Sequence, residues 1–148
     1  MTEKDITIRK AVPDDIRAIA KLEAECFNDA SSENAIATLF GMGAFGVVAF
    51  DESTLCGAAY ASDCAGDAEL LRICVKKEYR GYGTGRRLIT ALHSDLRGSN
   101  VGSVFLEVRE SNRAAISLYS SEGYVITGKR KSFYKAPTED ALLFTKKL

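Results

Sequence analysis

Apolar positions recur along the chain with two different periods, which predict alternating strands and helices. A period of two, or a short continuous apolar run, predicts strands over residues 6–9, 45–50, 55–61, 69–75, 104–108, 124–126 and 141–144. A helical period predicts helices over residues 16–27, 33–40, 83–98 and 112–121. Residues 51–54 separate two strand-like runs and indicate a hairpin.

Residues with clear capping chemistry mark several helix ends. Ser31, Ser32 and Glu33 can cap the second helix, and Ser111 with Asn112 can cap the last one. Gly98 is a natural end for the third helix. The resulting order is strand, two helices, three strands, helix, strand, helix and two strands, which predicts one mixed α/β sheet with helices on its faces.

The 148 residues, 46% of them hydrophobic, are enough for one domain over residues 1–148. Lys plus Arg total 20 and Asp plus Glu total 20, so the net charge is zero and direct nucleic-acid binding is not expected. The longest nearly apolar stretch, Gly41–Phe50, is about half of the ~20 residues that span a bilayer. Because Met1–Asp5 also shows no signal-peptide pattern, we expect a soluble, cytoplasmic protein without a membrane partner.

The cysteines and the single histidine form no recognisable metal or nucleophile pattern. There is no C-x-x-C pair among the four cysteines, which argues against structural zinc and against Cys–His catalysis. We interpret the cysteines as reduced thiols packed like small apolar side chains. We expect His93 on the core side of its helix and no metal in the protein.

The most informative segment is Arg80–Arg87, which reads RGYGTGRR between a buried strand and an amphipathic helix. Glycines at alternate positions allow a tight turn, and the first free N–H groups of a helix favour an anion. Five cations stand within twelve residues of an otherwise neutral chain: Lys76, Lys77, Arg80, Arg86 and Arg87. This combination predicts a site for a phosphate or pyrophosphate.

Two better-known glycine loops do not fit this segment. The chain has no G-x-x-x-x-G-K-[ST] run, and a G-x-G-x-x-G pattern fails because its last position is Arg86 or Leu88. A tight turn beside a solvated basic face, without a ligand, remains the alternative.

The segment Arg80–Gly85 resembles the R/Q-x-x-G-x-G/A acyl-coenzyme A loop of the GNAT acetyltransferase family. Other segments look like the bacterial ribosomal-protein-alanine N-acetyltransferases of that family: Glu69–Val75, Leu106–Asn112, Ala114–Tyr119 and Glu122–Tyr124. The resemblance is strong from about residue 69 to 134. It implies the GNAT fold, a single mixed, mostly antiparallel sheet with helices on both faces.

The resemblance also implies how acetyl-CoA, the expected cosubstrate, is held. The strand at Ile73–Val75 would pair with the pantetheine arm, the glycine loop would hold the pyrophosphate, and Asn112 would hydrogen-bond the carrier. The expected acetyl-CoA contacts are Ile73, Cys74, Val75, Arg80, Gly81, Tyr82, Gly83, Thr84, Gly85, Arg86 and Asn112.

For catalysis, the resemblance implies Glu107 as the proton acceptor and Tyr119 as the donor to the departing thiolate. Asn112 and Tyr119 are seven residues apart, so they share one helix face about 10 Å apart along the axis. A thioester is already activated, so direct attack by a neutral amine needs no covalent nucleophile. The alternatives are a surface carboxylate at Glu107, a core aromatic at Tyr119 and a simple helix cap at Asn112.

The expected acceptor is the α-amino group of a protein, such as the N-terminal alanine or serine of a ribosomal protein. An α-amine has a pKa of about 7.7–8, against about 10.4 for lysine, so a carboxylate base can supply its neutral form more easily. Tyr134 resembles the aromatic residue that lines the family's peptide groove. The segment Phe27–Ser31 lacks the family's common Trp-Ser pair, which indicates an altered acceptor site.

Two other functions remain open. One is acetylation of a small-molecule amine, and the other is an acyl-CoA-binding module without catalysis. The expected oligomeric state is a monomer or a homodimer.

Overall fold

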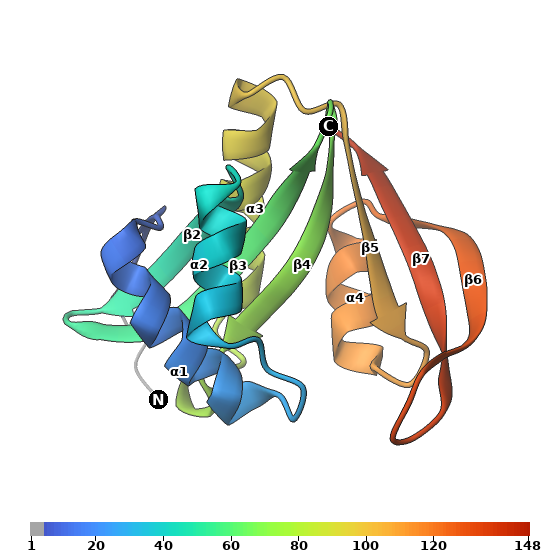
Figure 1. The fold of residues 1–148 in the computed structure, drawn as a ribbon, viewed down its shortest axis with the longest axis horizontal. Coiled ribbons are helices and arrows are strands. Elements are labelled where there is room, and N and C mark those ends of the chain that lie inside the picture. Colours follow the sequence, from blue (N-terminus) through green and yellow to red (C-terminus); the bar gives the residue numbers. More distant parts are fainter. Residues whose placement is uncertain (1–4) are drawn as a thin grey trace.

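The structure, a computed structural model, describes residues 5–148 (Figure 1). The prediction about a signal peptide concerns mainly residues 1–4, which lie outside the described residues. Seven strands are present: β1 (Ile6–Lys10), β2 (Phe45–Asp51), β3 (Thr54–Cys64), β4 (Asp67–Val75), β5 (Ser103–Arg109), β6 (Val125–Tyr134) and β7 (Glu139–Lys147). The helices are α1 (Ile16–Cys26), α2 (Glu33–Gly41), α3 (Thr84–Gly98) and α4 (Arg113–Ser121), with short 3₁₀ turns at Pro13–Asp15 and Lys77–Tyr79.

The strands form one sheet in the order β1-β2-β3-β4-β5-β7-β6. Within residues 5–148 the β4–β5 pair is parallel and the other five pairs are antiparallel. Two apolar clusters lie on its two faces, one beneath α1 and α2 and the other beneath α3 and α4. Figure 1 shows α1 and α2 in front of the sheet and α3 behind it. This confirms the predicted mixed sheet with helices on both faces.

The predicted caps stand at the helix ends. The Ser32 hydroxyl accepts a hydrogen bond from the Ala35 N–H at 3.1 Å, and Asn112 Oδ1 accepts one from the Ala115 N–H at 3.2 Å. Helix α3 ends at Gly98, as expected. These side chains satisfy N–H groups that have no partner inside the helix.

Two expectations were wrong. Strand β6 does not end at Ile126 but continues to Tyr134 as the edge of the sheet, with all of its residues exposed or half-buried. The charged residues of β6 interrupt the apolar pattern that predicts a strand. An edge strand can carry such charges, whereas a central strand cannot. Cys64 is exposed near the β3–β4 turn, so it is not packed like Cys56 and Cys74, which are buried.

The single histidine lies on the core side of α3, as predicted. His93 is 3% exposed, and its Nε2 lies 2.7 Å from the Tyr124 hydroxyl. The Tyr124 ring packs in turn on that of Tyr119, with centroids 5.5 Å apart. This contact connects α3 to the start of β6 and to α4.

Two irregularities at the centre of the sheet shape the site: β4 and β5 diverge, and β4 contains a β-bulge. Strands β4 and β5 are paired at three positions, ending at Glu69 and Phe105, and then diverge (Figure 1). In β4 the register against β3 shifts, because Tyr60 faces Arg72 whereas Ala61 faces Leu70. The extra residue reverses which side chains face each side of the sheet. Leu70 accordingly belongs to the cluster beneath α3, and Cys74 to the one beneath α1.

No helix within residues 5–148 combines the length and the apolar character needed to cross a bilayer.

Candidate active site

A cavity of about 440 Å³ lies between the end of β4, the glycine loop and the start of α4. It is bounded by the strand residues Ile73, Cys74 and Val75 on one side and by Ala115 and Leu118 on the other. At its end the backbone of the glycine loop turns into α3, a helix of 15 residues. An anion at this end would meet the free N–H groups and the positive end of a long helix.

The glycines of the loop differ in what they contribute. Gly81 and Gly83 adopt φ angles of +86° and +80°, and a Cβ on either would meet no atom within 4 Å. Their backbone conformation therefore requires glycine, and the loop surface stays open to a ligand. Gly85 lies inside α3, and a Cβ there would meet Leu118 at an ordinary 3.7 Å. The turn thus depends on two glycines, not three.

Most of the residues expected to contact acetyl-CoA surround this cavity. Nine of them line it: Ile73, Cys74, Val75, Arg80, Gly81, Gly83, Thr84, Gly85 and Asn112. Tyr82 and Arg86 are not among its lining residues. Arg86 forms an ion pair with Glu122 at 3.1 Å and donates to the Ser121 hydroxyl at 3.1 Å. These contacts engage part of the Arg86 guanidinium, and its contact with a phosphate stays a prediction.

Arg80 folds back over the end of β4. Its Nε donates to the Val75 carbonyl at 2.8 Å, and one terminal nitrogen lies 3.6 Å from the Cys26 sulfur. The guanidinium therefore fastens the glycine loop to the strand and to the end of α1. Part of its hydrogen-bonding capacity is used inside the protein.

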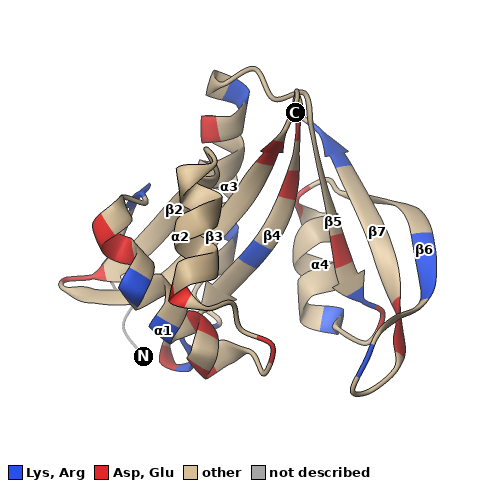
Figure 2. Ribbon diagram, in the orientation of Figure 1, with Lys and Arg blue, Asp and Glu red and all other residues tan. Residues whose placement is uncertain are grey.

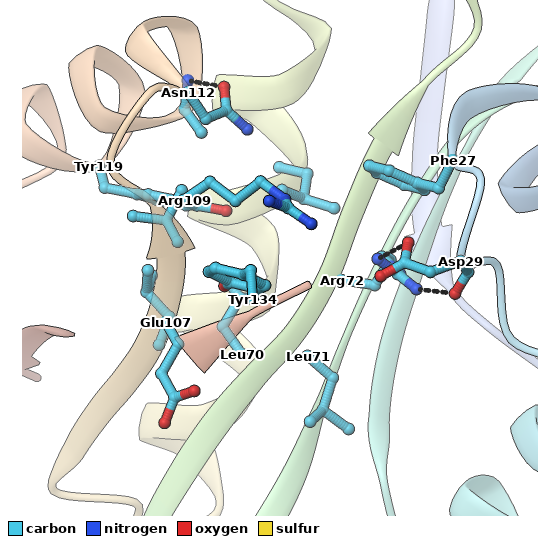
Figure 3. Close-up of a pocket in the computed structure, with 14 residues that line it drawn as sticks. Phe27, Asp29, Leu70, Leu71, Arg72, Glu107, Arg109, Asn112, Tyr119 and Tyr134 are labelled. Atoms are coloured by element: carbon cyan, nitrogen blue, oxygen red, sulfur yellow. Dashed lines mark hydrogen bonds and ion pairs between the residues drawn. The ribbon is translucent and has the colours of Figure 1, made fainter. Parts of the chain in front are cut away.

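A second cavity of about 190 Å³ continues from the first toward β5. Asn112 and Phe27 line both cavities, and Tyr119, Glu107 and Tyr134 line the second. The Asn112 Oδ1 caps α4, while its amide nitrogen is directed into the space between the strands (Figure 3). Asn112 therefore combines a capping role with a group available to a ligand.

Tyr119 is a buried phenol at the edge of the second cavity. It is 6% exposed, and its ring packs against those of Tyr124 and Phe144. Burial raises the pKa of its hydroxyl far above the usual 10, with a further contribution from Tyr134. The phenol is therefore fully protonated at neutral pH, which is the state a proton donor needs.

Glu107 lies on β5 with its carboxylate turned away from Tyr119 and Asn112 (Figure 3). Its Oε1 forms an ion pair with Arg130 Nε at 3.2 Å, and its side chain is 22% exposed. Glu69 on β4 has a raised pKa because of burial and the charge of Glu107. Contact between Glu107 and an amine beside Tyr119 therefore needs a bridging water or a rotamer change.

Strands β4 and β5 each carry a further residue of the site that sequence reasoning did not assign, Arg72 and Arg109. Arg72 stacks over the Phe27 ring at 4.4 Å, and Arg109 stacks over the Tyr134 ring at 4.5 Å (Figure 3). Phe27 and Tyr134 line a third, wider cavity of about 700 Å³. No local pattern marks either arginine, because each acts through residues distant in sequence.

Among residues 5–148 no group of three or more His, Cys, Asp or Glu side chains is arranged to hold a metal ion.

Comparison with known proteins decides the family. Residues 15–124 match the acetyltransferase (GNAT) family. The chain belongs to the GNAT acetyltransferase family. The matched range extends from just before α1 to just past the end of α4 and includes the glycine loop, β4 and β5, whereas β1, β6 and β7 lie outside it.

Within the GNAT family the similar proteins include N-terminal acetyltransferases. The chain is 40% identical over 74 residues to the [ribosomal protein bS18]-alanine N-acetyltransferase of Escherichia coli, covering 50% of this chain and 49% of the relative. It is 42% identical over 73 residues to the N-alpha-acetyltransferase RimI of Mycobacterium tuberculosis, covering 49% and 44%. The matched segments therefore span about half the length of these relatives.

Solved structures of the family match over the whole fold. The crystal structure of the ribosomal-protein-S18-alanine N-acetyltransferase from Escherichia coli superposes with a TM-score of 0.90 at 28% identity, covering 97% of this chain and 94% of that one. Arabidopsis thaliana NAA60 in complex with acetyl-CoA gives a TM-score of 0.86 at 20% identity, covering 97% and 99%, and shows the shared fold.

Proposed function

We propose that the protein transfers an acetyl group from acetyl-CoA directly to the N-terminal α-amino group of a protein. The observation that carries this proposal is the junction of two cavities at Asn112 and Phe27. One cavity has the glycine turn and helix end suited to a pyrophosphate, and the other holds a protonated phenol and a carboxylate. A long carrier in the first would deliver its acyl end to the second.

Glu107 and Tyr119 each carry out one of the two proton transfers that the reaction needs. Glu107, acting through water, takes a proton from the amine or from the tetrahedral intermediate. Tyr119, whose hydroxyl is protonated at neutral pH, gives a proton to the leaving thiolate. Backbone N–H groups of Ile73–Val75 are the donors available to stabilise the developing oxyanion.

Acceptor choice is the finer part of the proposal. Similar proteins from Escherichia coli and Mycobacterium tuberculosis are named for acetylation of alanine in ribosomal protein bS18 and of α-amines. The aromatic residues Phe27 and Tyr134 on opposite sides of the wide cavity suit an extended peptide segment. We therefore favour a protein N-terminus that begins with alanine or serine, in the cytoplasm, as the acceptor.

Mass spectrometry of reactions with acetyl-CoA tests the donor and the acceptor together. The acceptors are peptides that begin with alanine or serine and contain an internal lysine, the same peptides with a blocked N-terminus, and a panel of small amines. We expect one acetyl group, which fragmentation places on the free α-amine, and free CoA in equal amount. The variants Glu107→Gln and Tyr119→Phe report whether the assigned residues carry the reaction.

The other outcomes separate the competing functions. Turnover of small amines with inert peptides would leave a GNAT enzyme with another acceptor. Tight acetyl-CoA binding without any acetylated product would indicate a binding module. Whether the protein is a monomer or a homodimer stays a prediction that sedimentation can test.

A further inference from the structure

Two loops flank the acceptor side of the proposed site. One lies beside β4 and the other beside β5, the two strands that diverge at the centre of the sheet. The α1–α2 loop, residues 27–32, begins with Phe27, and the β6–β7 loop, residues 135–138, follows Tyr134. Both line the wide cavity. These loops belong to segments more than 100 residues apart, so the distance between them depends on what fastens each to the sheet.

The first loop is fastened to β4 by Arg72. The guanidinium stacks on Phe27, donates to the Asp29 carbonyl oxygen at 3.0 Å and lies 3.5 Å from the Asp29 carboxylate. Figure 3 shows these groups together on the β4 side of the site. A planar cation with several donors can make the stack and the carbonyl bond at once, which a lysine cannot.

Behind Arg72 stands a carboxylate that is completely buried. Glu23 of α1 accepts hydrogen bonds from Arg72 Nε at 2.9 Å, from the Ser31 N–H at 2.8 Å and from the Tyr60 hydroxyl at 2.7 Å. A buried carboxylate is stable only with such partners. Glu23 therefore fixes the direction of Arg72 and also holds the far end of the same loop.

The second loop is fastened to β5 by Arg109 in the same manner. Its guanidinium stacks on Tyr134 and donates to the carbonyl oxygens of Lys135 and Pro137, both at 3.0 Å. It also pairs with Glu139 at 3.2 Å. Each diverging strand thus carries one arginine that stacks on an aromatic residue and binds the backbone of the loop beside it.

We propose that Arg72 and Arg109 are positioning residues that hold Phe27 and Tyr134 at the spacing an acceptor peptide requires. The inference rests on the proposed function for its kinetic consequence. Neither arginine lines the cavity with the glycine loop, although Phe27 borders it, so we expect a larger effect on the acceptor than on acetyl-CoA. Loosening either loop widens the cleft and adds an ordering cost to acceptor binding.

The test uses Arg72→Lys and Arg109→Lys, which keep the charge and remove the stack and the second donor. Arg17→Lys, on the exposed face of α1 with a side chain 89% exposed, is the matched control. We expect each of the two variants to raise the acceptor KM about tenfold, which corresponds to about 1.4 kcal/mol. The acetyl-CoA dissociation constant and the kcat at saturating acceptor change by a smaller factor than the acceptor KM.

Hydrogen exchange supplies a readout that does not depend on activity. In Arg72→Lys, amides of residues 27–32 exchange faster while those of residues 135–138 keep their rate, and Arg109→Lys gives the converse. If the wild type acetylates no peptide, the proposed acceptor is wrong, and the exchange data still decide the positioning role. Unchanged exchange in both loops, an unchanged acceptor KM, or an equal loss of acetyl-CoA affinity would each overturn the inference.

Discussion

His93 makes the stability of the fold depend on pH in a range where most carboxylates have not yet titrated. The ring is 3% exposed and shares a hydrogen bond of 2.7 Å with Tyr124. Burial, together with the charges of Lys146 and Arg97, lowers the pKa of His93 from 6.5 to about 4. The folded state therefore resists protonation that the unfolded chain accepts.

The sign and size of the effect follow from the two pKa values. A lowered histidine pKa contributes stability that is complete above pH 6.5 and is lost progressively as pH falls toward 4. At about 1.36 kcal/mol per pKa unit the loss reaches about 3.4 kcal/mol below pH 4. Between pH 7 and pH 5, about 2 kcal/mol of the unfolding free energy is already lost.

Urea denaturation at pH 7 and pH 5, followed by circular dichroism, measures this loss in the wild type and in His93→Gln. Glutamine can keep a hydrogen bond to Tyr124 but does not titrate. Asp15, whose pKa Arg9 lowers, also destabilises the fold in acid, but equally in both proteins. The wild type should lose about 2 kcal/mol more than the variant. A difference below about 0.5 kcal/mol, within the error of such extrapolations, would refute the argument.

Other substitutions test the site and its support. Tyr119→Phe should lower kcat roughly 10²–10⁴-fold and leave calorimetric acetyl-CoA affinity unchanged, and an unchanged kcat would remove Tyr119 as the acid. Gly83→Asp, at a φ of +80° in the glycine loop, should weaken acetyl-CoA binding at least about tenfold, because it strains the backbone and its carboxylate repels the pyrophosphate. Gly66→Asp, at a φ of +100° in the β3–β4 turn, should leave affinity unaltered, so equal effects would contradict the turn's role. Glu23→Ala should lower the unfolding free energy in urea by about 3 kcal/mol, because it leaves Arg72 and the Tyr60 hydroxyl without their buried acceptor. Glu25→Ala, at an exposed residue of the same helix, should change it by under about 0.5 kcal/mol.

The parts of the fold with local signals were predictable from the sequence. Ser32, Gly98 and Asn112 mark helix ends by their own chemistry, and the glycine turn before α3 combines conformational and charge signals in one short segment. The central strands were recognisable because their apolar residues face helices on both sides of the sheet.

The parts that depend on distant partners were not predictable. Strand β6 carries Lys129 and Arg130, whose charges are matched by Glu110 and Glu107 from other segments. The bulge in β4 depends on its register against β3, which periodicity does not reveal. Arg72 joins Glu23 across 49 positions of the chain, so no local motif identifies either as part of the site.

The divergence of β4 and β5 has a consequence for how ligands can be found. Strands β4 and β5 are paired at three positions only. A molecule bound between the diverging parts of the two strands would therefore contact both sides of the sheet. Its binding would then favour the folded protein in proportion to the logarithm of its concentration over its dissociation constant. A melting-temperature screen of carriers with different acyl chains could therefore rank donors before any acceptor is known.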